Sequence, residues 1–198
     1  MTPQKIAEVI ASSTRAFEAE VYREAAPPPF GSWVRVPQPG GRVLYGLVSH
    51  VAVSPVEPTR RAVAFGKTED ELRRELPQVF ELLRTTLHAQ VLAYREAGGA
   101  VRQTLPPHPA ALHAFVYPCP DDEACDLGAP HDYLRTLVRH ADPAVPVDDL
   151  LVAVLSTVYR AHGGRHGGEP ALVGAARALS RLLDDDHERL QSILRRIA

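Results

Sequence analysis

The stretches Phe30-Gly31-Ser32-Trp33-Val34-Arg35-Val36 and Val43-Leu44-Tyr45-Gly46-Leu47-Val48 decide the fold expected of this chain. Both are short and rich in β-branched and aromatic residues, which favour strands. Each also carries a glycine, which allows a backbone to bend or to approach another strand closely. Together with residues 6–12 and 16–22 they form a series of short strands separated by Gly- and Pro-rich turns, a pattern typical of a small sandwich or barrel.

A helical segment interrupts this series of strands. Thr68 followed by Glu71 forms a capping box at a helix start, and Pro77 predicts a kink or two short helices. Residues 87–94 and 111–117 again read as strands. We therefore expect two late strands to close the barrel after the helical insertion.

The character of the chain changes at Pro118. Residues 118–130 are rich in Pro, Asp and Gly and are predicted to be a loop, followed by helices at 131–141 and 148–162. A glycine-rich break at 163–168 precedes one long amphipathic helix at 169–197. The fold class expected is α+β: a small antiparallel barrel over 1–119, with helices inserted at about 68–85, then a helical region over 120–198.

Composition bounds the function. The chain has 198 residues, a formal net charge of −2 and two cysteines, which is too few for a disulfide framework. The lack of a basic surplus argues against strong non-specific binding to duplex DNA. The sequence has no membrane-length apolar run and no secretory pattern at its start, so we expect a cytoplasmic protein without membrane contact.

Two kinds of motif suggest phosphate or cation binding. Gly66-Lys67-Thr68 resembles the end of a P-loop, but Arg61 stands where that loop needs its first glycine, and the capping box explains Thr68. The acidic runs at 121–123 and 184–188 contain consecutive carboxylates, which point in different directions on a helix. We interpret both runs as solvated faces.

A third set, His113, Cys119, Cys125 and His131, contains residue types that bind zinc. Its spacing lacks the close Cys pair that structural zinc sites use, and His113 falls in an expected strand. We favour two reduced thiols with unrelated histidines, and we expect no metal, no cofactor and no catalytic residues.

The N-terminal strands resemble the HAS barrel, the small β-barrel of HerA-type DNA translocases and ATP synthase subunits. The residues that carry the resemblance are the stretch Ile6-Ala7-Glu8-Val9-Ile10-Ala11-Ser12-Ser13-Thr14, Phe17, residues 30–36, Tyr45-Gly46-Leu47-Val48, residues 66–85 and residues 114–119. In HerA proteins this barrel packs around a hexameric ring and docks the nuclease NurA. The Walker motif of their ATPase is missing here, so the resemblance implies an adaptor role without motor activity.

The leading hypothesis is a non-enzymatic module for protein–protein assembly, linked to DNA-end processing. Its partner is expected to be a HerA-type ATPase, a NurA-type nuclease or a second copy of the chain. Exposed strand edges and loops of a barrel offer pairing surfaces for such partners. The predicted contact residues are Phe30, Trp33, Arg35, Tyr45 and Arg60.

Two alternatives come from other functional classes. Trp33, Tyr45 and Phe65 on a barrel face would allow bases of single-stranded nucleic acid to stack, with Arg60-Arg61 and Arg73-Arg74 near the phosphates. We do not favour this, because barrel aromatics more often belong to the core. The second alternative is a zinc-dependent enzyme that uses the His/Cys set.

Overall fold

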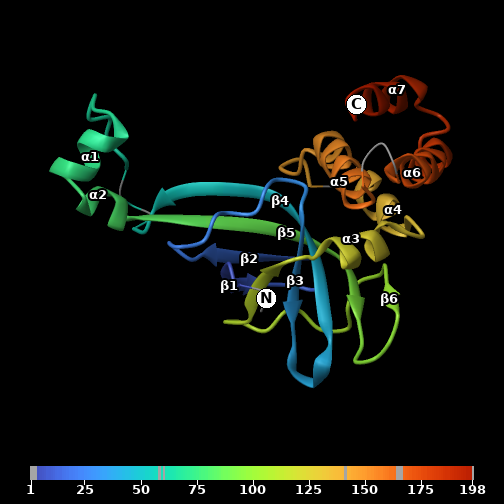
Figure 1. Ribbon diagram of the computed structural model, residues 1–198, viewed down its shortest axis with the longest axis horizontal. Helices are drawn as coiled ribbons and strands as arrows, with labels where there is room; N and C mark the ends of the chain where they lie inside the picture. Colours follow the sequence, from blue (N-terminus) through green and yellow to red (C-terminus); the bar gives the residue numbers. More distant parts are fainter. Residues whose placement is uncertain (1–3, 58, 60, 141, 164–166, 198) are drawn as a thin grey trace.

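The fold is α+β, as the sequence predicts. The computed structural model describes residues 4–57, 59, 61–140, 142–163 and 167–197. A closed barrel of 6 antiparallel strands occupies the N-terminal half, and the helices lie mostly in the C-terminal half. Figure 1 shows the larger group of helices on one side of the barrel and the short pair α1 and α2 well away from it.

The barrel closes because β2 pairs with β5 as well as with β1. The ring runs in the order β2, β1, β7, β3, β4, β5, and the short β6 continues from the outer edge of β5. Ala7 lies opposite Val116, and Phe17 opposite Ala89, so both late strands join the N-terminal ones as expected. The strand bounds are β1 (Ala7–Ser12), β2 (Ala16–Val21), β3 (Trp33–Pro37), β4 (Val43–Pro55), β5 (Leu83–Arg95), β6 (Val101–Arg102) and β7 (Phe115–Pro118).

Alternation along the strands separates an interior from an exterior. Val34 and Val36 of β3 pack inside the barrel, and Trp33 lies outside in a second core. Gly46 belongs to the inner side, because a Cβ there would lie 2.8 Å from Cε1 of Phe17. The glycine in the second opening stretch therefore permits a close approach between strands, as predicted.

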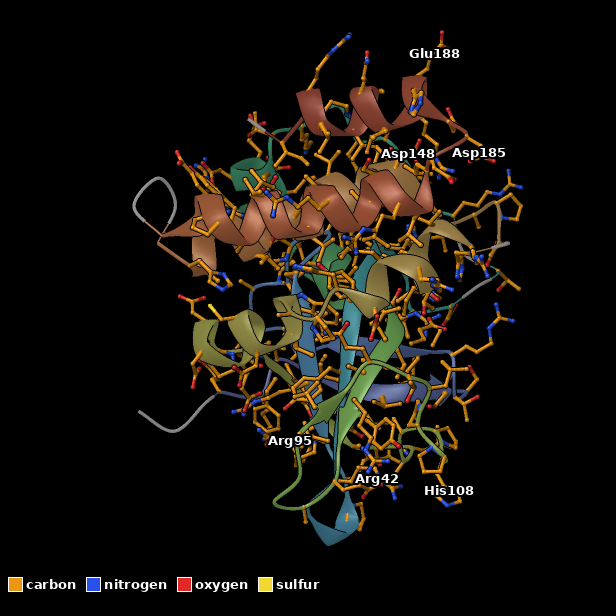
Figure 2. All side chains as sticks on the ribbon, turned by 90° about the vertical axis from the view of Figure 1, so that its right-hand side faces the viewer. Arg42, Arg95, His108, Asp148, Asp185 and Glu188 are labelled. Atoms are coloured by element: carbon orange, nitrogen blue, oxygen red, sulfur yellow. The ribbon has the colours of Figure 1, made fainter. Side chains whose placement is uncertain are left out.

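The C-terminal helices pack on the outside of this barrel. Their apolar faces meet outward-facing side chains of β3, β4 and β5 in one continuous core, in which the barrel residues are Trp33, Tyr45, Leu47, Leu92 and Ala93. Figure 2 shows these helices layered over the barrel, with α7 farthest from it. The helix bounds are α3 (Asp121–Gly128), α4 (Asp132–Val138), α5 (Val147–Ala161), α6 (Gly168–Leu182) and α7 (His187–Arg195).

The loop predicted over 118–130 is wrong, because α3 occupies most of it. Three acidic residues in the first turn of α3 complement the helix dipole. Ala124 and Leu127 are buried on the face that meets the other helices. The buried Gln103 fixes the end of α3: its Nε2 donates to the carbonyl oxygens of Leu127 (2.9 Å) and Ala129 (3.0 Å).

The single helix predicted over 169–197 is also wrong. The chain forms α6 and α7, with a break between Leu182 and His187. Asp186 adopts a non-helical conformation, and its Oδ1 accepts a hydrogen bond from the Arg189 N–H at 3.1 Å. The aspartate therefore starts a new helix. The glycine-rich break predicted before α6 includes residues 164–166, which lie outside the described residues.

Replacing Asp186 by alanine removes this cap. We expect the free energy of unfolding to fall by about 1 kcal/mol, the usual cost of losing an N-cap side chain. Asp185→Ala is the matched control, because Asp185 is equally exposed but does not cap α7. Urea unfolding of the two variants measures the difference, and equal stabilities would contradict the capping role.

The predicted strand at 111–117 is shorter than expected. β7 begins at Phe115, because His113 has a φ of 65° and breaks the extended conformation.

The helical insertion agrees with the sequence: Thr68 and Glu71 form a complete capping box, and α1 (Glu69–Glu75) and α2 (Gln78–Glu81) are separate helices. None of the helices in the described ranges is long and apolar enough to cross a membrane.

Candidate functional site

Trp33 and Tyr45, two predicted contact residues, are covered by the chain's own helices. Trp33 is 3% exposed and Tyr45 is fully buried. The Trp33 ring meets the Tyr133 ring of α4 edge to face, with centroids 5.5 Å apart. Both rings therefore pack between the helices and the barrel wall, and neither presents an open face to a base or to another protein.

Arg35, the third predicted contact residue, pairs within the chain. Its Nη1 lies 2.7 Å from Oε1 of Glu123 on α3, and Arg95 of β5 approaches the same oxygen at 3.6 Å. Glu123 is thus part of an ion-pair cluster beneath α3 and does not belong to a solvated face, which corrects the interpretation of the 121–123 run. The cluster fixes α3 to the barrel.

Cys119 lies next to this cluster, with its Sγ 3.9 Å from Oε2 of Glu123. Burial raises the pKa of the Cys119 thiol to about 12, and the negative charge of Glu123 adds to the effect. Burial also raises the pKa of Tyr45 to about 12. Both groups therefore stay protonated at neutral pH, so Cys119 lacks the thiolate character of a reactive nucleophile.

The four candidate zinc ligands have different surroundings. Nδ1 of His113 lies 2.7 Å from Oε1 of Glu8, and this contact lowers the pKa of Glu8. Burial lowers the pKa of His131, which precedes α4. Among the residues that the structure describes, no group of three or more His, Cys, Asp or Glu side chains is arranged to hold a metal ion.

The P-loop-like segment forms part of a helix cap. The Thr68 hydroxyl accepts a hydrogen bond from the Glu71 N–H, and Lys67 pairs with Glu75. The second acidic run is exposed, as expected, apart from the capping role of Asp186. Figure 2 labels Asp185, which lies just before α7, and Glu188, which lies in the first turn of that outermost helix.

β4 has an unpaired edge in the part of the strand that extends toward α1 and α2. β4 pairs with β3 over Val43–Leu47, and the Val48 backbone still exchanges hydrogen bonds with Gly31 and Ser32, but β4 continues alongside β5 as far as Pro55. No described strand pairs with the second edge of β4 beyond this region. Figure 1 shows β4 and β5 extending together toward α1 and α2, and we call this extension, with its two helices, the arm.

The arm carries many of the exposed large apolar side chains of the described residues. Val53 and Val63 are 66% and 69% exposed, and the full set on the arm is Val53, Val56, Val63, Phe65 and Leu82. Exposed apolar residues that gather in one region mark interaction surfaces. This set was not predicted from the sequence, although the charge-free stretch Val51-Ala52-Val53-Ser54 indicates an unprotected strand.

A groove of about 550 Å³ lies beside the start of this edge. Phe30, the fourth predicted contact residue, is 36% exposed in it. The groove is mostly apolar, and its walls are residues 27–30, residues 49–51 and Pro143, Ala144 and Pro146. The fifth predicted residue, Arg60, lies outside the described residues.

Comparison with known proteins adds no assignment to this geometry. No protein-family model matches the chain, and no curated protein shows significant sequence similarity to it.

Proposed function

We propose that this protein is a non-catalytic assembly module that binds an extended segment of another protein along the free edge of β4. One observation carries the proposal: an unpaired, charge-free strand edge that runs from an apolar groove to an apolar arm. Unpaired backbone N–H and C=O groups on such an edge accept an added strand. The groove at Phe30 would take an apolar side chain of the same segment.

The chemistry of this edge supports binding. Proteins usually protect exposed edges with lysine, proline, bulges or very short strands. β4 has a register irregularity between Val48 and His50 and a proline at position 55, but Val51–Ser54 between them carries no charge. The edge between the irregularity and Pro55 can therefore still pair with an added strand.

The class of partner follows from the resemblance to HAS barrels, which a closed six-stranded antiparallel barrel supports. We propose a HerA-type ATPase or a NurA-type nuclease as the partner, with a role in DNA-end processing. Self-association through the same edge is the other form of this proposal. The alternative of single-stranded nucleic-acid binding has less support, because Trp33 and Tyr45 are buried and only Phe65 of the proposed stacking residues is exposed.

Val53→Lys tests the proposal by placing a charge on the free edge. We expect it to weaken binding of a HerA-type ATPase or NurA-type nuclease from the same organism by about tenfold or more, as loss of a central interface residue does. Phe30→Ala should also weaken binding, because it removes the aromatic wall of the groove. Calorimetric titration of the purified proteins measures both effects.

Val173→Lys is the matched control, because Val173 is also an exposed valine but lies on α6. It should bind as the wild type does. Equal affinity of the Val53→Lys and wild-type proteins would contradict the role of the edge. Failure of both partners to bind, together with a monomeric wild-type protein in light scattering, would contradict the assembly function.

A further inference from the structure

A separate cavity of about 280 Å³ lies between the barrel wall and α4. Its floor consists of three consecutive residues of β5, Gln90, Val91 and Leu92, all of which are buried. Three exposed arginines form its rim: Arg15, Arg135 and Arg139. Leu105, Thr136 and His140 complete the lining, so no carboxylate faces the cavity.

The backbone fixes where these arginines start. Arg15 lies in the turn between β1 and β2, where Ser13 Oγ accepts a hydrogen bond from the Arg15 N–H at 3.2 Å. The Val91 N–H donates to the Arg15 carbonyl oxygen at 2.8 Å, which ties this turn to the cavity floor. Arg135 and Arg139 stand one turn apart at the end of α4, so they share a face of the helix.

Several arginines of the described residues pair with carboxylates, whereas the three at the cavity do not. Arg35, Arg42 and Arg189, for example, each pair with a carboxylate at 3.0 Å or less. Within the described ranges, none of the three arginines at the cavity forms an ion pair. Positive charges gathered at one cavity repel each other, and a bound anion would offset this repulsion because it attracts each arginine.

The polar groups around the rim match a phosphate group. Guanidinium groups bind phosphate oxygens through paired N–H donors, and the Thr136 hydroxyl supplies a further donor at the same rim. His140 has a buried Nε2 that lacks a hydrogen-bond partner among the described residues. Val91, Leu92 and Leu105 give the cavity an apolar side, which suits the organic part of a phosphate ester.

The geometry points to a binding site for a small phosphomonoester, with its phosphate held by Arg15, Arg135 and Arg139. The volume lies just below the usual range for ligand pockets, so the site suits a small molecule better than a polymer. This site is distinct from the β4 edge and does not depend on the proposed assembly function.

Calorimetric titration at low salt with inorganic phosphate, AMP and an unphosphorylated oligothymidine tests the site. We expect AMP to bind and phosphate to compete with it. Arg135→Gln and Arg139→Gln should each weaken AMP binding by about tenfold, the effect of losing one charge-assisted hydrogen bond near the surface. Arg15→Gln should do the same from a different element, which guards against a local effect on α4.

Arg181→Gln is the matched control, because it removes an exposed helical arginine that does not line the cavity. It should leave AMP affinity unchanged. AMP should also raise the thermal midpoint of the wild type more than that of the three cavity variants. The inference is overturned if neither phosphate nor AMP binds, if Arg181→Gln weakens binding equally, or if the oligothymidine binds and AMP does not compete with it.

Discussion

Replacing Trp33 by alanine should lower the free energy of unfolding by about 3–5 kcal/mol, the usual range for a buried Trp→Ala change. The side chain is 3% exposed and packs against Tyr133 in the core that the barrel shares with the helices. Its removal leaves a cavity there, which the surrounding backbone of two packed layers cannot easily fill. Trp33 is the single tryptophan of the chain, so the variant has no tryptophan fluorescence to follow. Urea unfolding monitored by far-UV circular dichroism therefore measures the loss.

Phe30→Ala is the control for Trp33→Ala, because it truncates an aromatic residue of the same segment that is 36% exposed. We expect it to cost less than about 1 kcal/mol, as surface substitutions usually do. A similarly small loss in Trp33→Ala would contradict the packing of the helices against this face of the barrel.

The second large effect is expected from Gly31→Ala. Gly31 has a φ of +74°, which alanine adopts at a cost of about 1–2 kcal/mol. A Cβ at this position would also overlap the side chain of Ala153 on α5, and such overpacking costs about 1–3 kcal/mol more. The glycine of the first opening stretch therefore permits a close approach to a helix, whereas Gly46 permits one between strands.

Gly40→Ala separates these two contributions. Gly40 has a similar φ of +78°, but a Cβ there meets no atom within 4 Å, so only the backbone cost remains. Chemical denaturation should show Gly31→Ala to be the less stable variant by about 1–3 kcal/mol. The double variant Gly31→Ala, Ala153→Gly should recover part of that difference. Equal losses in the two single variants would show that the contact with α5 is unimportant.

Much of the barrel could be predicted because its signals are local. Runs of β-branched and aromatic residues between Gly- and Pro-rich turns identified the early strands, and the Thr68–Glu71 spacing identified the start of α1. The errors occurred where distant contacts decide the local structure. In α3, the apolar positions 124 and 127 matter only because other helices cover them, and their surroundings have a loop-like composition. Between α6 and α7, residues 184–189 are all polar, but Leu190 follows Leu183 by seven residues, so the apolar positions on the two sides of the break keep helical phase.

The predicted contact residues show the same limit. Alternation indicates that Trp33, Arg35 and Tyr45 face out of the barrel, but it does not distinguish a face covered by the chain's own helices from one open to a partner. Phe30 is more exposed than these three residues, and it lies before β3 begins. The arginine-lined cavity was beyond sequence reasoning, since Arg15 and Arg135 are brought together only by the packing of α4 on the barrel.

The pairing of β1 with β7 has a consequence for how the protein is made. Ala7 meets Val116, so the ring of strands cannot close during translation until most of the barrel sequence has left the ribosome. Until then, β1 and β3 each lack a neighbour and remain able to pair with other nascent chains. Pairings so distant in sequence also slow folding. The newly synthesised chain is therefore most vulnerable to aggregation just before residues 115–118 emerge.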